Sequence, residues 1–309
     1  MAAPVPVQPR RHPLRRLERG AAQRHLRARA GPAPRSPLNS PKGYTVSDLS
    51  VAPEPISGHG LLTGRVAVIT AAAGTGIGSS TARRMLDEGA DVVVSDWHER
   101  RLKQTEQELA AAFPQRRVAS VVCDVTSTEQ VDELIAASVN ALGRIDIMVN
   151  NAGLGGETPV VDMTDEQWDR VLDITLNGTF RCTRAALGYF RSAGHGGVIV
   201  NNASVLGWRA QYGQAHYAAA KAGVMALTRC SAVEAAELGV RINAVAPSIA
   251  RHPFLDKVSS TELLDRLAGQ EAFGRAAEPW EVAATIAMLA SDYTSYMTGE
   301  IVSVSSQRA

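Results

Sequence analysis

Residues 65–96 read RVAVITAAAGTGIGSSTARRMLDEGADVVVSD, and this stretch decides the fold class. It begins with an apolar run at 65–70, continues through small residues at 71–78, and then spaces its apolar side chains as a helix does. A second apolar run at 91–95 is rich in valine, which is typical of a strand covered on both faces. Strand, helix and strand in this order predict a right-handed crossover between two parallel strands.

The same alternation continues along the chain. Further runs of strand length lie at 117–123, 145–150, 197–201, 241–246 and 300–303. Helical spacing begins near Ile77, Glu99, Thr128, Asp165, Ala215 and Pro279. We therefore predict an α/β protein, with a single doubly wound Rossmann domain over residues 46–309 and a mostly parallel seven-stranded sheet. In such sheets, ligands bind at the carboxyl ends of the strands.

The loop AAAGTGIG at residues 71–78 has the composition of a phosphate-binding turn. Small side chains let the backbone approach a pyrophosphate, and the helix that follows supplies amide donors and a positive dipole. A glycine-rich loop alone is a weak signal, but this one follows a strand and opens a helix. The position therefore favours a dinucleotide.

Asp96 ends the second strand, where an acid accepts hydrogen bonds from the adenosine ribose hydroxyls and repels a 2′-phosphate. Trp97 follows it rather than a basic residue. These features predict NAD as the cofactor, although Arg100 and Arg101 leave NADP as an alternative. A helix cap is the other reading of Asp96.

A second motif, SVLGWRAQYGQAHYAAAK at residues 204–221, carries the chemistry. Tyr217 and Lys221 lie four apart in an alanine-rich segment, so a helix places both side chains on one face. A lysine ammonium beside a phenol favours the phenolate and lowers a pKa that starts near 10. Such a tyrosine exchanges protons with a substrate oxygen, which the Ser204 hydroxyl also binds. The alternative is that Tyr217 and Lys221 are an ordinary pair on an amphipathic helix. Only four of the 32 basic residues are lysines, so a lysine at this spacing is not expected by chance.

Residues 1–45 differ from the rest of the chain. They hold ten of the 32 basic residues and one of the 31 acids, which leaves 22 basic and 30 acidic residues in 46–309. We expect this proline- and alanine-rich leader to be disordered. It reads as a transit peptide, as a phosphate-binding arm, or as an artefact of a start codon assigned upstream of Val46. The intact mass of the native protein distinguishes the last reading.

The composition of the rest of the chain argues against several classes of function. The acidic globular part gives no sign of nucleic-acid binding, and no run of eighteen apolar residues predicts a membrane span. Cys123, Cys182 and Cys230 have no metal-binding spacing, and we expect no metal site. A reducing cytoplasm is the expected location.

With these motifs in order, residues 60–305 resemble the classical short-chain dehydrogenases/reductases. The resemblance implies that Tyr217 is the general acid/base, that Lys221 binds the nicotinamide ribose, and that Ser204 holds the carbonyl oxygen. It also implies a homotetramer or homodimer. The cofactor-binding residues that it implies are Gly74, Gly76, Ile77, Gly78, Asp96, Asp124, Val125, Asn151, Ala152, Gly153, Tyr217, Lys221, Pro247 and Ile249.

Several positions depart from the family pattern. The glycine loop is one residue longer, and Ala71 stands where the first glycine is usual. Thr175 aligns with the catalytic asparagine, and its hydroxyl is expected to hold the water of the proton relay. His252 aligns with the threonine that binds the carboxamide. The C-terminal glycine pair is replaced by Ser305 and Ser306.

A narrower resemblance involves TAAAGTGIG, NNASVLGWRAQ, HYAAAKAGVMALTRCSA and INAVAPSIARH. These segments are similar to actinobacterial steroid-degradation reductases that act on CoA-linked C/D-ring fragments. The implied reaction interconverts the 5-hydroxyl and 5-ketone of a methylindane propanoyl-CoA. The alternatives are a 3-oxoacyl-CoA/ACP reductase of fatty-acid type and a cofactor-binding regulator without turnover.

The segment 249–275 is expected to form the substrate lid. We expect its cations to meet CoA phosphates and its apolar side chains to cover the rings, unless the segment is a solvated loop. Trp208 and Arg209 are expected to line the pocket or to pack at a subunit contact. The lid side chains in question are Arg251, His252, Phe254, Leu255 and Lys257.

Overall fold

A computed structural model describes residues 49–258 and 260–306, without the side chains of residues 254, 257 and 258. The predicted leader, residues 1–45, lies outside the described residues. The strands are β1 (Val66–Ile69), β2 (Asp91–Asp96), β3 (Val118–Val122), β4 (Ile147–Asn150), β5 (Gly197–Asn202), β6 (Val240–Pro247) and β7 (Ile301–Val304). They form one sheet in the order β3-β2-β1-β4-β5-β6-β7, and every pair is parallel. The predicted doubly wound sheet is confirmed.

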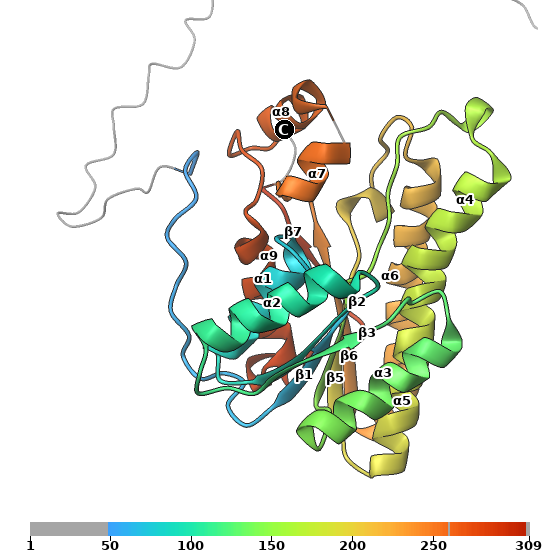
Figure 1. The fold of residues 1–309 in the computed structure, drawn as a ribbon. Coiled ribbons are helices and arrows are strands. Elements are labelled where there is room, and N and C mark those ends of the chain that lie inside the picture. Colours follow the sequence, from blue (N-terminus) through green and yellow to red (C-terminus); the bar gives the residue numbers. More distant parts are fainter. Residues whose placement is uncertain (1–48, 259, 307–309) are drawn as a thin grey trace, which may run out of the picture. The chain divides into compact units, whose positions relative to one another are not determined.

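Helices cover both faces of the sheet (Figure 1). One layer contains α1 (Ile77–Asp87), α2 (Glu99–Ala112) and α9 (Pro279–Ala290), and the other contains α3 (Thr128–Leu142), α5 (Gly178–Ala193) and α6 (Ala215–Ala235). The alternation of side chains along β1 divides the core between them. Ala67 and Ile69 pack in the first layer, whereas Val66 and Val68 pack in the second. All four side chains are buried, as a central parallel strand requires.

The six predicted helix starts agree with the structure, but two regions differ from the prediction. The helix predicted from Asp165 is α4 (Asp165–Leu172), which a π-helical turn, Asp173–Asn177, joins to α5. Two further helices, α7 (Pro253–Val258) and α8 (Thr261–Gly269), follow β6 and lie at the top of Figure 1. Both regions border the carboxyl ends of the strands.

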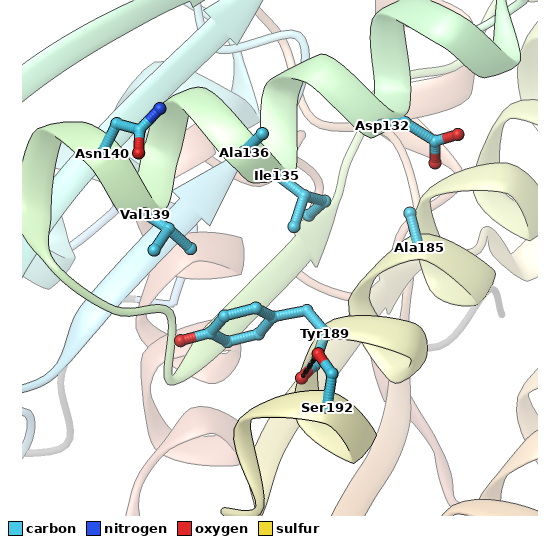
Figure 2. A pocket seen from close by; sticks show the side chains of 8 residues that line it. All are labelled: Asp132, Ile135, Ala136, Val139, Asn140, Ala185, Tyr189 and Ser192. Atoms are coloured by element: carbon cyan, nitrogen blue, oxygen red, sulfur yellow. Dashed lines mark hydrogen bonds between the residues drawn. The ribbon is translucent and has the colours of Figure 1, made fainter.

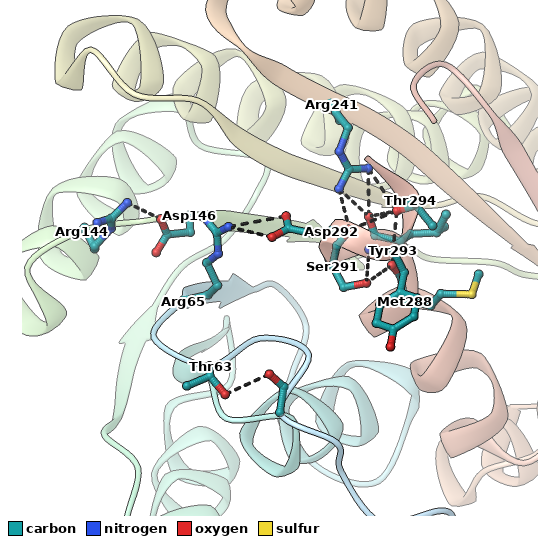
Figure 3. A network of polar contacts seen from close by, with 12 residues as sticks. Thr63, Arg65, Arg144, Asp146, Arg241, Met288, Ser291, Asp292, Tyr293 and Thr294 are labelled. Carbon is teal, nitrogen blue, oxygen red and sulfur yellow. Dashed lines mark hydrogen bonds and ion pairs between the residues drawn. The ribbon is translucent and has the colours of Figure 1, made fainter. Parts of the chain in front are cut away.

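A polar network closes the amino-terminal edge of the sheet (Figure 3). Asp146 is buried just before β4, where it accepts a 2.9 Å hydrogen bond from Val66 N and an ion pair of 2.5 Å from Arg144. Arg65 lies 3.9 Å from Asp146 and 3.4 Å from Asp292. Arg241 donates to the carbonyl oxygens at the end of α9. These interactions hold the strand starts together and leave the opposite edge for a ligand.

Among the residues that the structure describes, no helix has both the length and the apolar content needed to cross a bilayer.

Candidate active site

A cleft of about 1200 Å³ lies at the carboxyl ends of the strands. Ligand pockets for one drug-sized molecule measure roughly 300–1000 Å³, so this cleft has room for two reactants. Its lining includes every residue that the sequence predicted for catalysis or cofactor binding. These residues come from the ends of β1, β2, β3, β4, β5 and β6, from the first turn of α1 and from the first two turns of α6.

The glycine loop has the backbone that its sequence requires. Ala71 has a φ of 50°, in the left-handed region that glycine adopts more readily. A Cβ on Gly78 would lie 2.3 Å from the Ala71 carbonyl oxygen and 2.6 Å from Asn151 Nδ2. Asn151 Nδ2 donates to the carbonyl oxygens of Thr70 and Ala71, each at 3.1 Å. Ala71 therefore adopts a left-handed backbone conformation at the position of the family's first glycine, and Gly78 has no room for a side chain.

Asp96 closes this loop from β2. Its side chain is buried and accepts hydrogen bonds from Ala73 N at 3.3 Å and His98 N at 3.0 Å. The N-cap of α2 is His98, whose ring accepts from Arg101 N. The helix-cap reading of Asp96 is therefore wrong, and its carboxylate lies at the cleft wall.

Ser204, Tyr217 and Lys221 meet in the same cleft. Ser204 follows β5 and is buried, and Tyr217 and Lys221 lie one turn apart on α6. The Lys221 ammonium is 5.5 Å from the centroid of the Tyr217 ring, and it donates a hydrogen bond to the Asn202 carbonyl oxygen. The predicted shared face of the helix is thus present.

The expected effect of Lys221 on the Tyr217 pKa is wrong for this structure. Burial raises the pKa of Tyr217 to about 12, and a hydrogen bond with the Ser204 side chain acts in the opposite direction. Burial also lowers the pKa of Lys221 to about 7. Because Lys221 is only 2% exposed, its own charge is disfavoured and it stabilises the phenolate weakly.

Thr175 has a different partner from the predicted one. In the π-helical turn, its hydroxyl donates to the Leu154 carbonyl oxygen at 3.1 Å and accepts from Leu154 N at 3.0 Å. The hydroxyl proton is therefore not available to the expected relay water. Instead, Thr175 fixes the loop after β4, in which a Cβ on Gly155 would lie 3.5 Å from the Tyr217 ring and one on Gly153 would lie 3.3 Å from Lys221 Nζ.

The lid differs in part from the sequence prediction. Arg251 forms ion pairs with Asp256 at 2.9 Å and Asp265 at 2.7 Å, so its charge is matched within the lid. His252 and Leu255 line the cleft, as does Arg209. Trp208 is not part of the lining and is 52% exposed. The side chains of residues 254 and 257 lie outside the described residues.

Ser306, one of the two serines at the position of the family's C-terminal glycine pair, forms two hydrogen bonds. Ser306 Oγ donates to Glu271 Oε2 at 3.2 Å and accepts from Phe273 N at 3.4 Å. It therefore connects the end of β7 with the segment after α8. The sequence did not predict this contact, because the two residues lie far apart along the chain. It also did not predict the roles of Asn202 and Leu154, because both residues act through backbone atoms, which every residue has.

A second hollow, of about 340 Å³, lies between α3 and α5 (Figure 2). Its main polar groups are Asp132, Asn140, Tyr189 and Ser192. The Tyr189 hydroxyl accepts from Ile145 N and lies 3.4 Å from His195 Nε2, which indicates a structural role. The larger cleft is therefore the candidate active site.

The cleft fits a nicotinamide dinucleotide by its own structure. No side chain fits at Gly78, and the N-terminus of α1, which supplies backbone amide donors for a pyrophosphate, lines the cleft. Asp96 and Lys221 also line the cleft, where they offer carboxylate oxygens and an ammonium group. These are the donors and acceptors that two riboses and a pyrophosphate require.

Comparison with known proteins agrees with this geometry. The family model described as enoyl-(acyl carrier protein) reductase matches residues 71–306. A Mycobacterium tuberculosis protein named (5R,7aS)-5-hydroxy-7a-methyl-1-oxo-2,3,5,6,7,7a-hexahydro-1H-indene-carboxyl-CoA reductase is 74% identical over 260 residues, which cover 84% of this chain and 99% of that protein. The 3-oxoacyl-[acyl-carrier-protein] reductase of Thermotoga maritima is 37% identical over 79% of this chain and 97% of its own length.

The chain is also similar to a solved structure of a short-chain dehydrogenase. The crystal structure of a short-chain dehydrogenase from Mycobacterium smegmatis has 68% sequence identity and a TM-score of 0.76. The match covers 84% of this chain and 100% of that one.

Proposed function

The chain belongs to the short-chain dehydrogenase/reductase family, and from this premise we propose that it is an NAD-dependent oxidoreductase of steroid degradation. Its substrate is a bicyclic C/D-ring fragment carried on CoA, and it interconverts a ring hydroxyl and a ketone. The observation that carries the proposal is the meeting of Ser204, Tyr217 and Lys221 in one cleft with room for two reactants. The 74% identity to the named indene-carboxyl-CoA reductase directs the choice of substrate.

Tyr217 is the proposed proton donor and acceptor. Its raised pKa keeps the phenol protonated at neutral pH, so it is ready to protonate the oxygen of a ketone that is being reduced. The Ser204 hydroxyl, also at the cleft, hydrogen-bonds the same oxygen and orients the ring carbon. A bound nicotinamide carries the hydride.

Lys221 has a positioning role in this proposal. Its hydrogen bond to the Asn202 carbonyl oxygen fixes the side chain beside Tyr217, and we propose that its remaining donors bind the nicotinamide ribose. Thr175 supports both residues indirectly, because it fixes the loop at Leu154 that packs next to them. This arrangement replaces the expected water-holding role of Thr175.

Asp96 supports NAD rather than NADP. Its carboxylate is held by two backbone amides at the cleft wall, where a 2′-phosphate would be repelled. Arg101 also lines the cleft and is the group that would favour NADP. Asp96 is the better placed of the two, because its backbone partners hold the carboxylate in one orientation.

The proposed ring substrate follows the relative's name. That name places the thioester carboxyl group on the hexahydroindene itself, so we propose a ring carboxyl-CoA in place of the propanoyl-CoA of the sequence prediction. Leucines of α8 supply an apolar cover for such a ring system. The cleft-lining leucines of this helix are Leu263, Leu264 and Leu267.

We also propose a cytoplasmic homotetramer or homodimer. Phe180 on α5 and Val233 on α6 are 45% and 76% exposed, and such apolar groups are candidates for a subunit contact. Light scattering measures the assembly directly, and a monomer would contradict this part of the proposal.

The test is a turnover assay that follows the absorbance of the reduced nicotinamide. NAD and NADP are supplied in parallel with the bicyclic hydroxy thioester and with 3-hydroxybutyryl-CoA. We expect the highest kcat/KM for the bicyclic thioester with NAD. A preference for the short thioester with NADP would instead support a 3-oxoacyl thioester reductase.

A further inference from the structure

Four carboxylates are buried among the residues that the structure describes, and one differs from the others. Glu88 accepts from two backbone amides and pairs with Arg84. Asp146 accepts from one amide and pairs with arginines, and Asp96 accepts from two amides. Glu271, which is 5% exposed, accepts only from the Ser306 hydroxyl within the described part of the chain.

This difference has an energetic meaning. An ionised carboxylate has two oxygens and about four acceptor positions, and its burial is unfavourable unless donors fill them. The Ser306 hydroxyl supplies a single donor, at 3.2 Å from Oε2. Because Ser306 Oγ also accepts from Phe273 N, its proton is directed to the carboxylate. The orientation of Glu271 is therefore fixed, and its acceptor capacity exceeds its partners.

Glu271 lies at the wall of the active-site cleft. It follows α8, whose cleft-lining residues are otherwise leucines, namely Leu263, Leu264 and Leu267. A single acceptor at the end of an apolar wall is typical of a group that orients a ligand. The pairing with Glu271 also gives a role to Ser306, one of the two serines that replace the family's glycine pair.

The chemistry of the cleft restricts the donor. A carboxylate repels phosphate, so Glu271 faces a part of the ligand other than the pyrophosphate groups of CoA or the dinucleotide. Ring ketones and thioester carbonyls are acceptors and cannot pair with it. The donors that remain are hydroxyl groups and amide N–H groups. The proposed function already pairs the ribose hydroxyls with Asp96 and Lys221 and the ring oxygen with Ser204 and Tyr217. The amide N–H groups of the pantetheine arm of CoA and of the nicotinamide carboxamide have no such partner in it.

We propose that Glu271 is a ligand-binding residue that accepts a hydrogen bond from an amide N–H group in the cleft, with Ser306 as its positioning residue. If the amide belongs to the pantetheine arm, the proposal rests on the proposed function, because it requires a CoA thioester as substrate. If the amide belongs to the nicotinamide carboxamide, the proposal requires only that the cleft binds a nicotinamide.

The test replaces Glu271 with leucine and measures binding by calorimetry with matched pairs of ligands. The first pair is the bicyclic CoA thioester and the methyl thioester of the same acid, which lacks the pantetheine amides. The second pair is NAD and its 3-acetylpyridine analogue, which has a methyl ketone in place of the carboxamide. Glu262→Leu, at an exposed acid of α8, is the control variant.

We expect Glu271→Leu to weaken one amide-bearing ligand by roughly tenfold or more, the usual effect of losing a charge-assisted hydrogen bond. Its amide-free partner and the Glu262→Leu control should be unchanged. A loss confined to the CoA thioester identifies the pantetheine arm, and a loss confined to NAD identifies the carboxamide. Ser306→Ala should weaken the same ligand to a smaller extent.

Equal losses for both members of each pair would overturn the proposal, because they would show that Glu271 only shapes the lid. Unchanged affinities would overturn it as well. A wild-type enzyme that turns over no CoA thioester would refute the proposed function, but calorimetry with CoA and NAD would still test Glu271.

Discussion

Lys221 should make the protein less stable at low pH, and Lys221→Met should remove this effect. The ammonium is 2% exposed, and burial lowers its pKa from 10.5 to about 7. Between these two values the unfolded chain holds the lysine proton and the folded chain does not. The free energy of unfolding therefore rises with pH across this window and is lower below it.

The magnitude follows from the two pKa values. A difference of one pKa unit corresponds to about 1.4 kcal/mol, and between about pH 6 and about pH 9 the wild type should gain roughly 3 kcal/mol relative to the variant. The variant also loses the hydrogen bond to the Asn202 carbonyl oxygen. The loss of this hydrogen bond does not depend on pH. It therefore shifts the difference in the free energy of unfolding by a constant amount and does not change the slope of that difference with pH.

The assay is urea unfolding of the wild type and Lys221→Met at several pH values in this range. Other titrating groups affect both proteins equally, so the difference between their free energies of unfolding isolates Lys221. Lys103→Met, at an exposed lysine of α2, is the matched control and should show no such slope. Parallel curves for wild type and Lys221→Met would contradict this prediction, since they would mean that the buried amine keeps its ordinary pKa.

Three further predictions concern the same site. Thr175→Val should lower kcat/KM by roughly tenfold because the Leu154 backbone loses its hydroxyl partner, whereas Thr175→Ser should restore it; equal losses in steady-state assays of both variants would contradict this role. Gly78→Ala should weaken NAD in fluorescence titrations and lower the melting temperature, because its Cβ would lie 2.3 Å from the Ala71 carbonyl oxygen; unchanged values would refute the close approach. With a Tyr217 pKa of about 12, alcohol oxidation should accelerate about tenfold per pH unit at neutral to mildly alkaline pH while ketone reduction stays nearly constant; a pH-independent oxidation rate would count against Tyr217 as the base.

The sheet and its helices could be predicted because their signals are local. The apolar runs of the strands and the spacing that begins at Ile77 or Glu99 depend on neighbouring residues alone. The signal of the glycine loop is also local, since a residue without a side chain is required where two parts of the backbone approach each other closely, as at Gly78. The order of the motifs along the chain then placed the candidate residues at one edge of the sheet.

Other features depend on contacts between distant residues. The π-helical turn at Thr175 is coupled to Leu154, and Glu271 is coupled to Ser306, 35 positions later. The shift of the Tyr217 pKa was predicted with the wrong sign, because helical spacing fixes the distance to Lys221 but does not reveal how deeply both groups are buried. Burial is a property of the whole fold and therefore required the structure.

Comparison of Tyr217→Phe with the wild type, in two assays on the same preparation, tests the proposed proton transfer most directly. We expect the variant to bind NAD with nearly unchanged affinity and to show no measurable turnover of the bicyclic CoA thioester, because only the phenolic hydroxyl has been removed. Retained turnover in Tyr217→Phe would show that this hydroxyl does not transfer the proton.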